Sequence, residues 1–433
     1  MKKLICKLTA LALFLAMTLS VSSCDSGITD CPGVPLQTPE REPDVSGLSA
    51  VNLNEDYISN GFNMIPVDSS EPAIVFAIRM MSSLAGEKGG ESVVISPYSI
   101  LTALALTANG AAGETLSEME ATLGFKLDEL NEFLPSYTSS LPSTEKSKLT
   151  TANSIWIRND GSIEVKPSFI QRNVDLYRAD AYAAPFDEST LYDVNKWISD
   201  RTDGMIGKML EKIDPATVMY LINAVLFDAE WQNIYYENFV VKGAFTNAEG
   251  KAETADFMYD SETGLGFRLN GAVGLVRDYA ERGYEFVAVL PNGKTTPEEY
   301  LRELDPKELT GALTDSLESA DTCIPKFSIE YSAELKDVLR GLGMKVPFDP
   351  MHADFSELGT SGGNIYISNV IHRAKIEVNE RGTKAGAATV VDLAAGGMPV
   401  EKLEVRLDRP FIFFINDKAT HTPIFCGIVN SVA

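Results

Sequence analysis

The spacing of apolar residues separates an earlier, helical part of the chain from a later part that is rich in strands. Residues 71–84 carry apolar side chains at helical spacing, so that one face of the segment is apolar. Residues 97–106 open with a proline, which is favoured in the first turn of a helix, and residues 112–123 repeat the amphipathic pattern. We therefore expect three successive helices, the first of which buries Ile74, Phe76, Ile78, Met81 and Leu84.

Strand-like patterns dominate the later part of the chain. Residues 220–227, 285–290 and 365–378 are rich in apolar and β-branched residues, and a Pro-Asn-Gly turn follows the second of these segments. Residues 411–415 and 424–429 are apolar on both faces, which predicts a hairpin buried at the centre of the core. Long strands that follow a group of helices, without a regular alternation of the two, indicate an α+β fold.

The N-terminus has the features of a bacterial export signal. Lys2 and Lys3 precede an apolar run over residues 8–21, which is shorter than the roughly 20 residues that a membrane span needs. The next residues complete the sequence Val-Ser-Ser-Cys, which looks like the lipobox of bacterial lipoproteins. We expect residues 1–23 to be removed and Cys24 to carry lipid, which would hold the protein on a membrane. The alternative is an ordinary secretory signal with an incidental cysteine.

The segment that follows Cys24 differs in composition from the rest of the chain. Residues 24–55 contain four prolines among Asp, Glu, Ser and Gly, with few large apolar residues. Such a segment cannot bury enough surface to fold, so we expect a flexible tether. Residues 56–433 contain no second linker, repeat or low-complexity tract and are expected to form one large domain.

Charge and cysteine content narrow the class of protein. The formal net charge is −24, which disfavours a nucleic-acid partner because phosphate binding needs a basic surface. Hydrophobic residues make up 45% of the chain, enough for a sizeable core. Beyond Cys24 only Cys31, Cys323 and Cys426 remain, and the three histidines form no cluster with them at ligand spacing. We therefore expect buried free thiols and no disulfide framework, metal or cofactor.

Several short motifs, in the right order along almost the whole domain, resemble the serpin family. Each motif is weak alone, but six or more in sequence order are specific. The strongest is the run Glu-Val-Asn-Glu-Arg-Gly-Thr-Lys-Ala-Gly-Ala-Ala-Thr over residues 377–389. The others are Val94-Ile95-Ser96-Pro97-Tyr98-Ser99-Ile100, Val194-Asn195-Lys196-Trp197-Ile198, Leu221-Ile222-Asn223-Ala224, Ile324-Pro325-Lys326-Phe327, Leu342-Gly343-Met344 and Arg409-Pro410-Phe411.

The resemblance implies a fold and a mechanism. The expected fold has several helices around a large mixed β-sheet and smaller sheets, with an exposed reactive-centre loop. A serine protease, or a cysteine protease as a further class, would attack that loop and form an acyl-enzyme. The freed part of the loop would then insert into the large sheet as a new strand and trap the protease in a covalent complex. The resemblance thus implies a monomeric protease inhibitor and not an enzyme. A non-inhibitory serpin with a binding or structural role is the alternative.

The residues around Gly382 also have a physical interpretation. Residues 371–380 alternate between two faces, as in a half-buried strand, and Gly382 permits a sharp change of direction. A loop that stays exposed does not require small residues, whereas a segment that slides between two strands does, because large or charged inward side chains would clash or lose their hydration. The residues that would form this insertion hinge are Gly382, Thr383, Ala385, Gly386, Ala387, Ala388 and Thr389.

The resemblance also assigns two polar clusters that control opening of the sheet. The shutter, a cluster beneath the sheet where strands must part, would contain Ser96, Ser99, Asn195 and His372. The breach, where the loop first enters, would contain Trp231, Lys326 and Glu380, with an ion pair between the last two. Serpins usually have Lys-Gly before the breach tryptophan, whereas this chain has Asp-Ala-Glu at 228–230, which puts the local electrostatics of the breach in doubt.

The cleavage site is defined only to within a few residues. Counting from the hinge as in inhibitory serpins places the scissile bond near Gly396-Gly397, and Ala394, Ala395 and Met398 remain alternatives. Small apolar residues suit the shallow pockets of elastase-like or subtilisin-like proteases. No Arg or Lys lies between Lys384 and Lys402, which argues against a trypsin-like target.

One motif favours a different class of protein, a serine hydrolase. Gly359-Thr360-Ser361-Gly362-Gly363 fits the G-x-S-x-G pattern of a nucleophile elbow. An elbow needs a strand before it and a helix after it, yet a strand-like segment follows here, so we expect an exposed loop. As for location, a lipid on Cys24 would place the protein on the outer membrane, facing the periplasm or the cell surface. Release to the extracellular medium is the alternative.

Overall fold

The structure is a computed structural model that describes residues 47–59, 61, 70–87, 89–383 and 402–432. Residues 43–433 form one compact unit. The three helices expected from the sequence are present as α1, α2 and α3, each within a few residues of its predicted bounds. The α-helices of the described residues are α1 (Glu71–Glu87), α2 (Pro97–Ala108), α3 (Gly113–Leu123), α4 (Leu127–Ser140), α5 (Pro167–Tyr177), α6 (Glu188–Arg201), α7 (Pro297–Glu303), α8 (Pro306–Asp315) and α9 (Lys336–Gly341).

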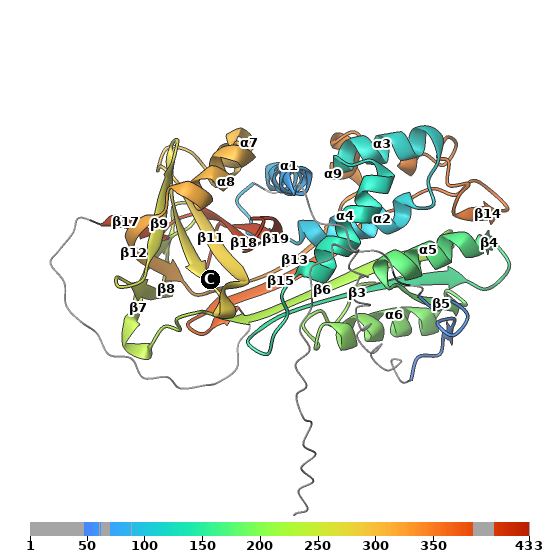
Figure 1. Cartoon of the computed structure of the whole chain (residues 1–433), viewed down its shortest axis with the longest axis horizontal. Coiled ribbons are helices and arrows are strands. Elements are labelled where there is room, and N and C mark those ends of the chain that lie inside the picture. The colour runs from blue at the N-terminus through green and yellow to red at the C-terminus, as the bar shows by residue number, and fades with distance from the viewer. Residues whose placement is uncertain (1–46, 60, 62–69, 88, 384–401, 433) are drawn as a thin grey trace, which may run out of the picture. The chain divides into compact units, whose positions relative to one another are not determined.

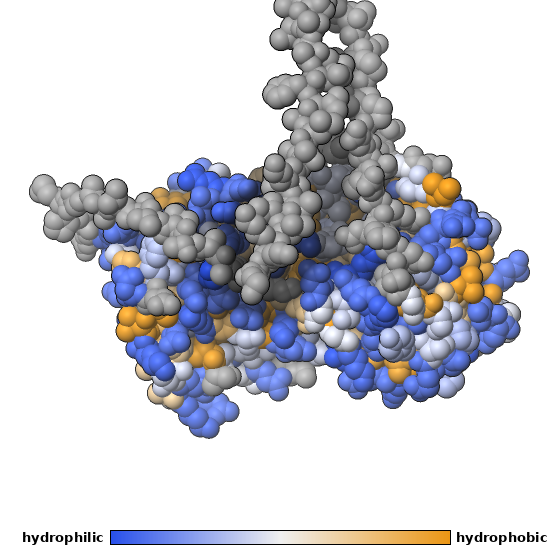
Figure 2. Space-filling view, turned by 90° about the horizontal axis from the view of Figure 1, so that it is seen from below, coloured by the Kyte–Doolittle hydropathy of each residue, from blue (hydrophilic) through white to orange (hydrophobic). Residues whose placement is uncertain are grey.

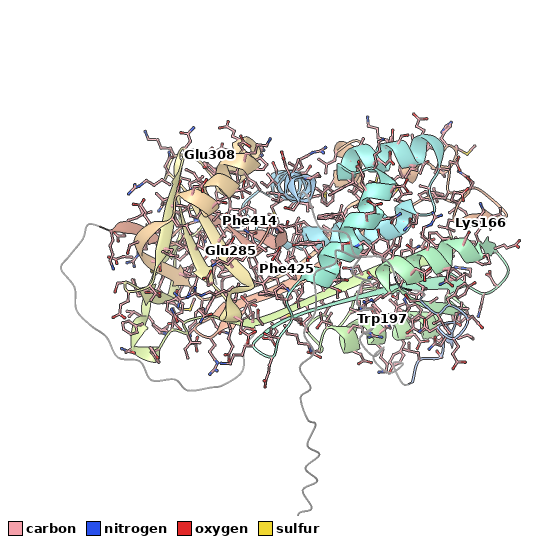
Figure 3. The ribbon with its side chains drawn as sticks, viewed as in Figure 1. Lys166, Trp197, Glu285, Glu308, Phe414 and Phe425 are labelled. Atoms are coloured by element: carbon pink, nitrogen blue, oxygen red, sulfur yellow. The ribbon has the colours of Figure 1, made fainter. Side chains whose placement is uncertain are left out.

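The large sheet has seven strands and contains both parallel and antiparallel pairs. Helix α6 lies on one face of this sheet, whereas α2, α4 and α5 lie on the other (Figure 1). Trp197 of α6 (Figure 3) is fully buried in a cluster with Trp156 and Tyr182 of the sheet. The strand order is β1 (Val51–Asn52), β5 (Asp180–Ala184), β3 (Ser147–Arg158), β6 (Met219–Glu230), β16 (Gly382–Thr383), β15 (Ile371–Asn379) and β13 (Phe327–Glu334).

The middle of the large sheet is incompletely paired. Among the described residues, strands β6 and β15 are joined only through the two-residue strand β16, which pairs with Val378 and Asn379 on one side and with Ala229 and Glu230 on the other. The predicted strand over residues 365–378 is therefore too long, because regular strand begins only at Ile371. Residues 365–370 form no regular strand: the backbone N–H of Ile367 donates to the carbonyl of Pro347, and the carbonyl of Val370 accepts from the backbone N–H of Leu335.

The predicted central hairpin is present within a second, larger sheet. Strands β18 and β19 pair along their length and every residue of both is buried, including Phe414 and Phe425 (Figure 3). The sheet order is β2 (Val93–Ile95), β19 (Pro423–Val429), β18 (Phe411–Asp417), β11 (Tyr284–Pro291), β10 (Ala272–Asp278), β9 (Leu265–Leu269), β12 (Glu318–Pro325), β8 (Ala252–Asp260) and β7 (Val240–Thr246), and β17 (Leu403–Arg406) pairs with β12. Strands β4 (Ile163–Val165) and β14 (Gly359–Ser361) form a separate pair.

The tether predicted over residues 24–55 ends earlier than expected. Strand β1 adds to the edge of the large sheet next to β5, and Leu53 donates its backbone N–H to the carbonyl of Ala181. The buried Asp193 of α6 accepts hydrogen bonds from the backbone of Ser49 and Ala50 and from the Ser49 hydroxyl, at 2.7–2.9 Å. Composition alone missed this segment because its strand is only two residues long and most of its contacts go to backbone groups and to one distant carboxylate.

Other features of the described residues agree with the composition. Cys323 and Cys426 are buried free thiols, and burial raises the pKa of Cys323 to about 11. No helix among the described residues is long and apolar enough to cross a membrane. The face that carries α6 exposes mostly hydrophilic side chains, with hydrophobic ones scattered among them (Figure 2). Cys24 and Cys31 lie outside the described part of the chain.

Candidate functional site

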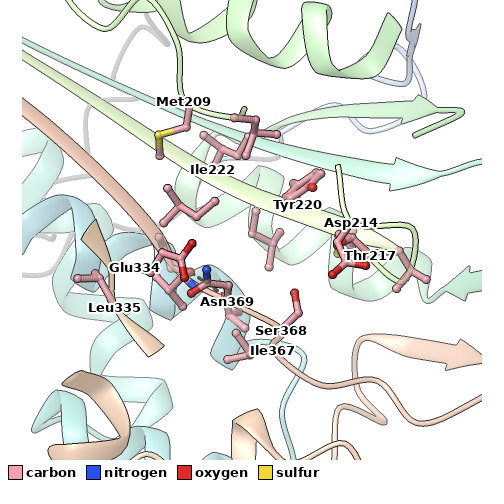
Figure 4. Close-up of a pocket in the computed structure, with 18 of the residues that line it drawn as sticks. Met209, Asp214, Thr217, Tyr220, Ile222, Glu334, Leu335, Ile367, Ser368 and Asn369 are labelled. Atoms are coloured by element: carbon pink, nitrogen blue, oxygen red, sulfur yellow. Dashed lines mark hydrogen bonds between the residues drawn. The ribbon is translucent and has the colours of Figure 1, made fainter. Parts of the chain in front are cut away.

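A cavity of about 1000 Å³ lies between β6 and β15. Figure 4 shows side chains of β6 such as Tyr220 and Ile222 on one wall and Ile367, Ser368 and Asn369 on the other. Its lining also includes residues of α2 and of the segment that follows α6. We call this cavity the slot. Within the described residues, the edges of β6 and β15 that line it are not paired with each other, and an unpaired strand edge can accept an additional strand.

Three of the four predicted shutter residues meet at the slot. The ring of His372 accepts a hydrogen bond through Nε2 from the backbone N–H of Ser96, at 3.1 Å. The Ser96 hydroxyl donates to the carbonyl of Ile424 at 2.7 Å and accepts from the backbone N–H of Ser99 at 3.2 Å. This hydroxyl is the N-cap of α2, which explains why a serine precedes Pro97. Burial lowers the pKa of His372 to about 4, so the ring is neutral at physiological pH.

The fourth predicted shutter residue, Asn195, lies elsewhere. Its side chain donates to the carbonyl of Leu210 and accepts from the backbone N–H groups of Met209 and Leu210, all at 2.7–2.8 Å. Asn195 therefore fixes the segment that follows α6, and it forms no hydrogen bond with the shutter cluster in the described part of the chain. The assignment was wrong because a helical motif gives no information about which distant segment its polar face contacts.

A different asparagine, Asn223 of β6, occupies the wall of the slot. Its side chain is 8% exposed and donates to the side chain of Asn153 on β3 at 2.8 Å, and Asn153 donates to the carbonyl of Tyr177. The Oδ1 atom of Asn223 is buried and has no hydrogen-bond partner among the described residues. In the sequence, Asn223 stands out only as part of the motif at 221–224. The available signal was a single amide within the apolar run 221–227.

The predicted ion pair of the breach is present. Lys326 Nζ lies 2.5 Å from Glu380 Oε2, and both side chains are about one-third exposed. Burial alone would raise the pKa of Glu380, but the hydrogen bond and charge of Lys326 lower it. Because Lys326 follows β12 and Glu380 follows β15, the pair fixes the position of the turn from which the hinge departs.

The breach tryptophan holds the backbone of the same turn. Trp231 is fully buried, its indole N–H donates to the carbonyl of Asn379 at 2.8 Å, and its backbone N–H donates to the carbonyl of Arg381 at 2.7 Å. The indole stacks on Tyr279 at a centroid distance of 4.6 Å. The Tyr279 hydroxyl, whose pKa burial raises, lies 2.7 Å from the hydroxyl of Thr383. The start of the hinge is thus tied to the core.

The acidic residue that departs from the serpin pattern has basic partners. Glu230 lies 3.4 Å from Arg381 and 3.9 Å from Lys146. The Glu230 carboxylate therefore joins the end of β6 to the turn and to the start of β3. Ala229, the residue before it, pairs with Thr383. The Asp-Ala-Glu sequence at 228–230 therefore changes the local charges at the breach relative to the usual serpin sequence. It leaves the strand pairing at the breach intact.

Gly382 cannot be replaced without disturbing β16. Its φ of +153° lies in a region that favours glycine, and a Cβ atom here would lie 2.0 Å from the carbonyl oxygen of Ala229. Thr383, the next residue, is 2% exposed. The remaining hinge residues Ala385, Gly386, Ala387, Ala388 and Thr389, the candidate bond at Gly396 and Gly397, and its alternatives Ala394, Ala395 and Met398 lie outside the described residues.

The G-x-S-x-G segment lacks the geometry of a nucleophile elbow. Ser361 ends β14, and its hydroxyl donates to the carbonyl of Gly363 at 2.7 Å. A turn precedes β14 and no helix follows it in the described part of the chain. The described residues also hold no group of three or more His, Cys, Asp or Glu that could bind a metal ion. The slot, the shutter and the breach are therefore the features around which a function can be built.

Comparison with known proteins gives one consistent result. The family model described as "Serpin (serine protease inhibitor)" matches residues 72–432. Human Serpin B8 is 29% identical over 379 residues, which cover 84% of this chain and 99% of that protein. Human glia-derived nexin is 26% identical over 396 residues, which cover 88% of this chain and 97% of that protein.

Solved structures agree with the sequence comparison. A thermophilic protein, Tengpin, described as being in the native state, aligns with a TM-score of 0.82 and 42% identity over 88% of this chain and 99% of that chain. The same protein described as being in the latent state aligns with a TM-score of 0.73 and 38% identity. The fold seen here is therefore more similar to the native than to the latent arrangement of that relative.

Proposed function

The chain belongs to the serpin family, and we propose that it inhibits serine proteases by inserting its cleaved reactive-centre loop into the slot. The proposal extends to cysteine proteases as a further target class and treats the protein as an inhibitor and not an enzyme. The observation that carries it is β16, where the first two hinge residues already pair with β6 and β15, and the same two strands line the slot farther along.

The pairing of β16 fixes the register of insertion. Thr383 lies opposite Ala229 of β6 and Val378 of β15, so each further loop residue would move one position back along both antiparallel strands. Residue 389 would then lie opposite Asn223 and His372. Strand β6 is 12 residues long and would be filled by residues 382–393. The candidate bond at Gly396-Gly397 follows a few residues later.

Side chains along this register fit the slot. The Thr383 side chain is buried, so residues 385, 387, 389, 391 and 393 would also face inward. These are two alanines followed by a threonine, a valine and a leucine, none of which brings a charge into the core. The hydroxyl of Thr389 would reach the level of Asn223, whose Oδ1 atom is a buried acceptor without a described partner. An inserted loop would therefore satisfy a group that the present state leaves unpaired.

Insertion is favoured by the groups that the slot leaves open. Each inserted residue adds backbone hydrogen bonds to two strands and buries apolar side chains, and these gains drive the folded chain toward a lower free energy. The higher similarity to the native than to the latent structure of Tengpin supports the view that this chain is folded in the state before insertion. Such a state persists because the barrier to insertion is high.

The target proteases follow from the bait residues. Ala394, Ala395, Gly396, Gly397 and Met398 offer small or unbranched side chains to the specificity pocket. Elastase-like and subtilisin-like proteases have shallow pockets that accept such residues. A trypsin-like protease needs Arg or Lys at this position and should be inhibited far more weakly.

The test mixes the purified protein with an elastase-like and a subtilisin-like protease. We expect a covalent complex that survives denaturing gel electrophoresis, with mass spectrometry of the released C-terminal peptide placing the cut between residues 394 and 398. A catalytically inactive Ser→Ala form of each protease is the matched control and should give no complex. If the loop is cut without a complex and without a rise in thermal stability, the inhibitory function is wrong. A non-inhibitory role would then replace it.

We also propose that the protein is exported and held on a membrane by lipid at Cys24. The support is the lipobox-like sequence after an apolar run that is too short to span a bilayer. Replacing Cys24 with serine should move the protein from the membrane fraction to the soluble fraction of expressing bacteria. It should also remove the change in gel mobility that the lipid causes. An unchanged membrane fraction would contradict the lipid anchor. Protease treatment of intact cells that express the wild type would distinguish the cell-surface location from the periplasmic location.

A further inference from the structure

The turn between β15 and β16 is held by one short connector. Residues 379–381 form this turn, which we call the pivot, and residues 231–235 form the connector. All three backbone carbonyls of the pivot accept hydrogen bonds from the connector. Trp231 donates its indole N–H to Asn379 at 2.8 Å and its backbone N–H to Arg381 at 2.7 Å, and Tyr235 donates its backbone N–H to Glu380 at 2.8 Å.

A buried arginine of β10 contacts the connector. Arg277 is 9% exposed, and its Nη2 group donates to the backbone carbonyl of Asn233. Its guanidinium lies 3.9 Å from the ring centroid of Tyr235 and 5.8 Å from that of Trp231. Arg277 therefore contacts both residues that hold the pivot, and it does so through its planar group.

The arginine is anchored by a carboxylate at the end of β8. Arg277 Nη1 lies 2.6 Å from Asp260 Oδ2, and the Asp260 side chain is 10% exposed. Asp260 also accepts hydrogen bonds from the backbone N–H groups of Glu262 and Thr263 and from the Thr263 hydroxyl. Burial alone would raise the pKa of Asp260, but the charge and hydrogen bond of Arg277 and the two hydrogen bonds from Thr263 lower it to about 2. The pair is therefore charged throughout the physiological range.

Such a buried ion pair fixes the positions of the segments that it joins more than it raises the free energy of unfolding. A buried ion pair often adds little net stability over apolar residues of the same size, because desolvation offsets the attraction between the charges. Its directional hydrogen bonds nevertheless fix the segments that it joins. Here the joined segments are β8, β10 and the connector, and the connector in turn holds the pivot.

We propose that Arg277 and Asp260 are positioning residues for loop insertion, which hold the pivot still while the chain beyond Gly382 moves into the slot. The proposal rests on the proposed inhibitory function. A fixed pivot starts insertion in a single register, with Thr383 opposite Ala229. A loosened pivot delays insertion, so more acyl-enzyme is hydrolysed before the protease is trapped.

The first experiment compares wild type with Arg277→Met, which keeps side-chain length and apolar contact with the rings but removes the guanidinium. The number of inhibitor molecules consumed per protease inhibited should rise several-fold. The initial rate of loop cleavage should stay within about twofold of wild type, because Arg277 is not part of the bait. Arg277→Lys should give the same direction of change, since a lysine cannot reproduce the planar contacts to both rings.

Controls separate positioning from a general loss of stability. Val174→Ala shortens a fully buried side chain of α5, away from the breach, and should lower the melting temperature without raising inhibitor consumption. If Arg277→Met fails to fold, Asp260→Asn is the second variant and should also raise consumption. Wild-type consumption in a folded Arg277→Met or Asp260→Asn protein would overturn the positioning role.

A second readout does not depend on inhibition. Each protein is nicked in its loop by a non-target protease, and the rate at which it gains thermal stability reports insertion. We expect slower gain for Arg277→Met than for wild type or Val174→Ala, and equal rates would contradict the proposal. If wild type inserts after nicking but forms no covalent complex, the inhibitory function fails while the ratio of variant to wild type still tests the pivot.

Discussion

The breach and the shutter hold β6 and β15 at two different levels and by different means. At the breach, charged and aromatic side chains surround a short strand that is already paired on both sides, and the Lys326–Glu380 pair is partly open to solvent. At the shutter, a neutral histidine and two serines form hydrogen bonds in a buried site beneath two strands that are not paired with each other. The breach is closed by contacts to the loop itself, and the shutter by contacts within the body.

This difference indicates which step of loop insertion each region controls. The breach contacts include hinge residues and therefore change as soon as the loop begins to move. The shutter contacts of the described residues join β15, α2 and β19, so they change only when the strands part farther along the slot. Substitutions in the two regions should consequently separate the start of insertion from the opening of the sheet.

The largest effect is expected from a charge at the entrance. Thr383→Arg would place a guanidinium where the native side chain is 2% exposed and bonds to Tyr279. An unpaired buried charge costs several kcal/mol, which should drive β16 out of the entrance and lower by more than about a hundredfold the fraction of molecules in which insertion starts there. The protease complex should disappear on gels while cleavage continues. Thr383→Ser keeps the hydroxyl and should retain the complex. Normal trapping by the arginine variant would show that the breach does not limit insertion.

The shutter should impose a pH dependence between pH 7 and pH 5. The pKa of His372 is about 4 in the folded chain and about 6.5 in the unfolded chain, so below pH 6.5 the unfolded chain takes up a proton that the folded chain does not. Stability is therefore highest above pH 6.5 and should fall by about 2 kcal/mol on going to pH 5. Urea unfolding should show this slope, and His372→Gln should flatten it. The exposed His352→Gln is the control, and an equal slope in all three proteins would contradict the assignment.

A smaller effect is expected from the breach ion pair. Lys326→Met removes a partner of Glu380 from a site that is about one-third exposed, so its loss should cost no more than about 1 kcal/mol. Activity on prolonged incubation should decline faster than for wild type, because the pivot is less well held. Glu380→Gln should have a similar effect, and the double variant should add little to it. Fully additive losses would show that the two side chains act independently.

The smallest effect is expected at the outer face of the slot. Arg373 of β15 lies 3.2 Å from Glu211 of the segment after α6, but Glu211 is 71% exposed. Glu211→Gln should therefore change unfolding free energy by less than about 0.5 kcal/mol. A larger loss in urea unfolding would show that this pair, and not only the shutter hydrogen bonds, holds the two walls of the slot together.

Local patterns predicted the parts of the molecule that depend on neighbouring residues. The alternation over 371–380 matches the burial of β15, in which His372, Ala374, Ile376 and Val378 are buried. The apolar runs at 411–415 and 424–429 are the buried hairpin. These predictions succeeded because side-chain periodicity is a property of each strand alone.

Features made by distant segments could not be predicted in the same way. The slot lies where the described residues place no strand beside β6 and β15 beyond the short β16, and no local pattern encodes the absence of a neighbour. Arg277 is buried only because the end of β8, with Asp260, and the connector, with Trp231 and Tyr235, come together around it. Asn195 was misplaced and Asn223 overlooked for the same reason, since an amide alone does not indicate its distant partner.

The early strand β1 has a practical consequence for work with shortened forms of the protein. A version cut at residue 55, where composition places the end of the tether, would lose the strand on β5 and leave the buried carboxylate of Asp193 without its three donors. Recombinant versions should therefore start before residue 47 if they are to represent the natural molecule. The same limit applies to transplanting the domain onto another anchor, because the join must lie upstream of the segment that completes the sheet edge.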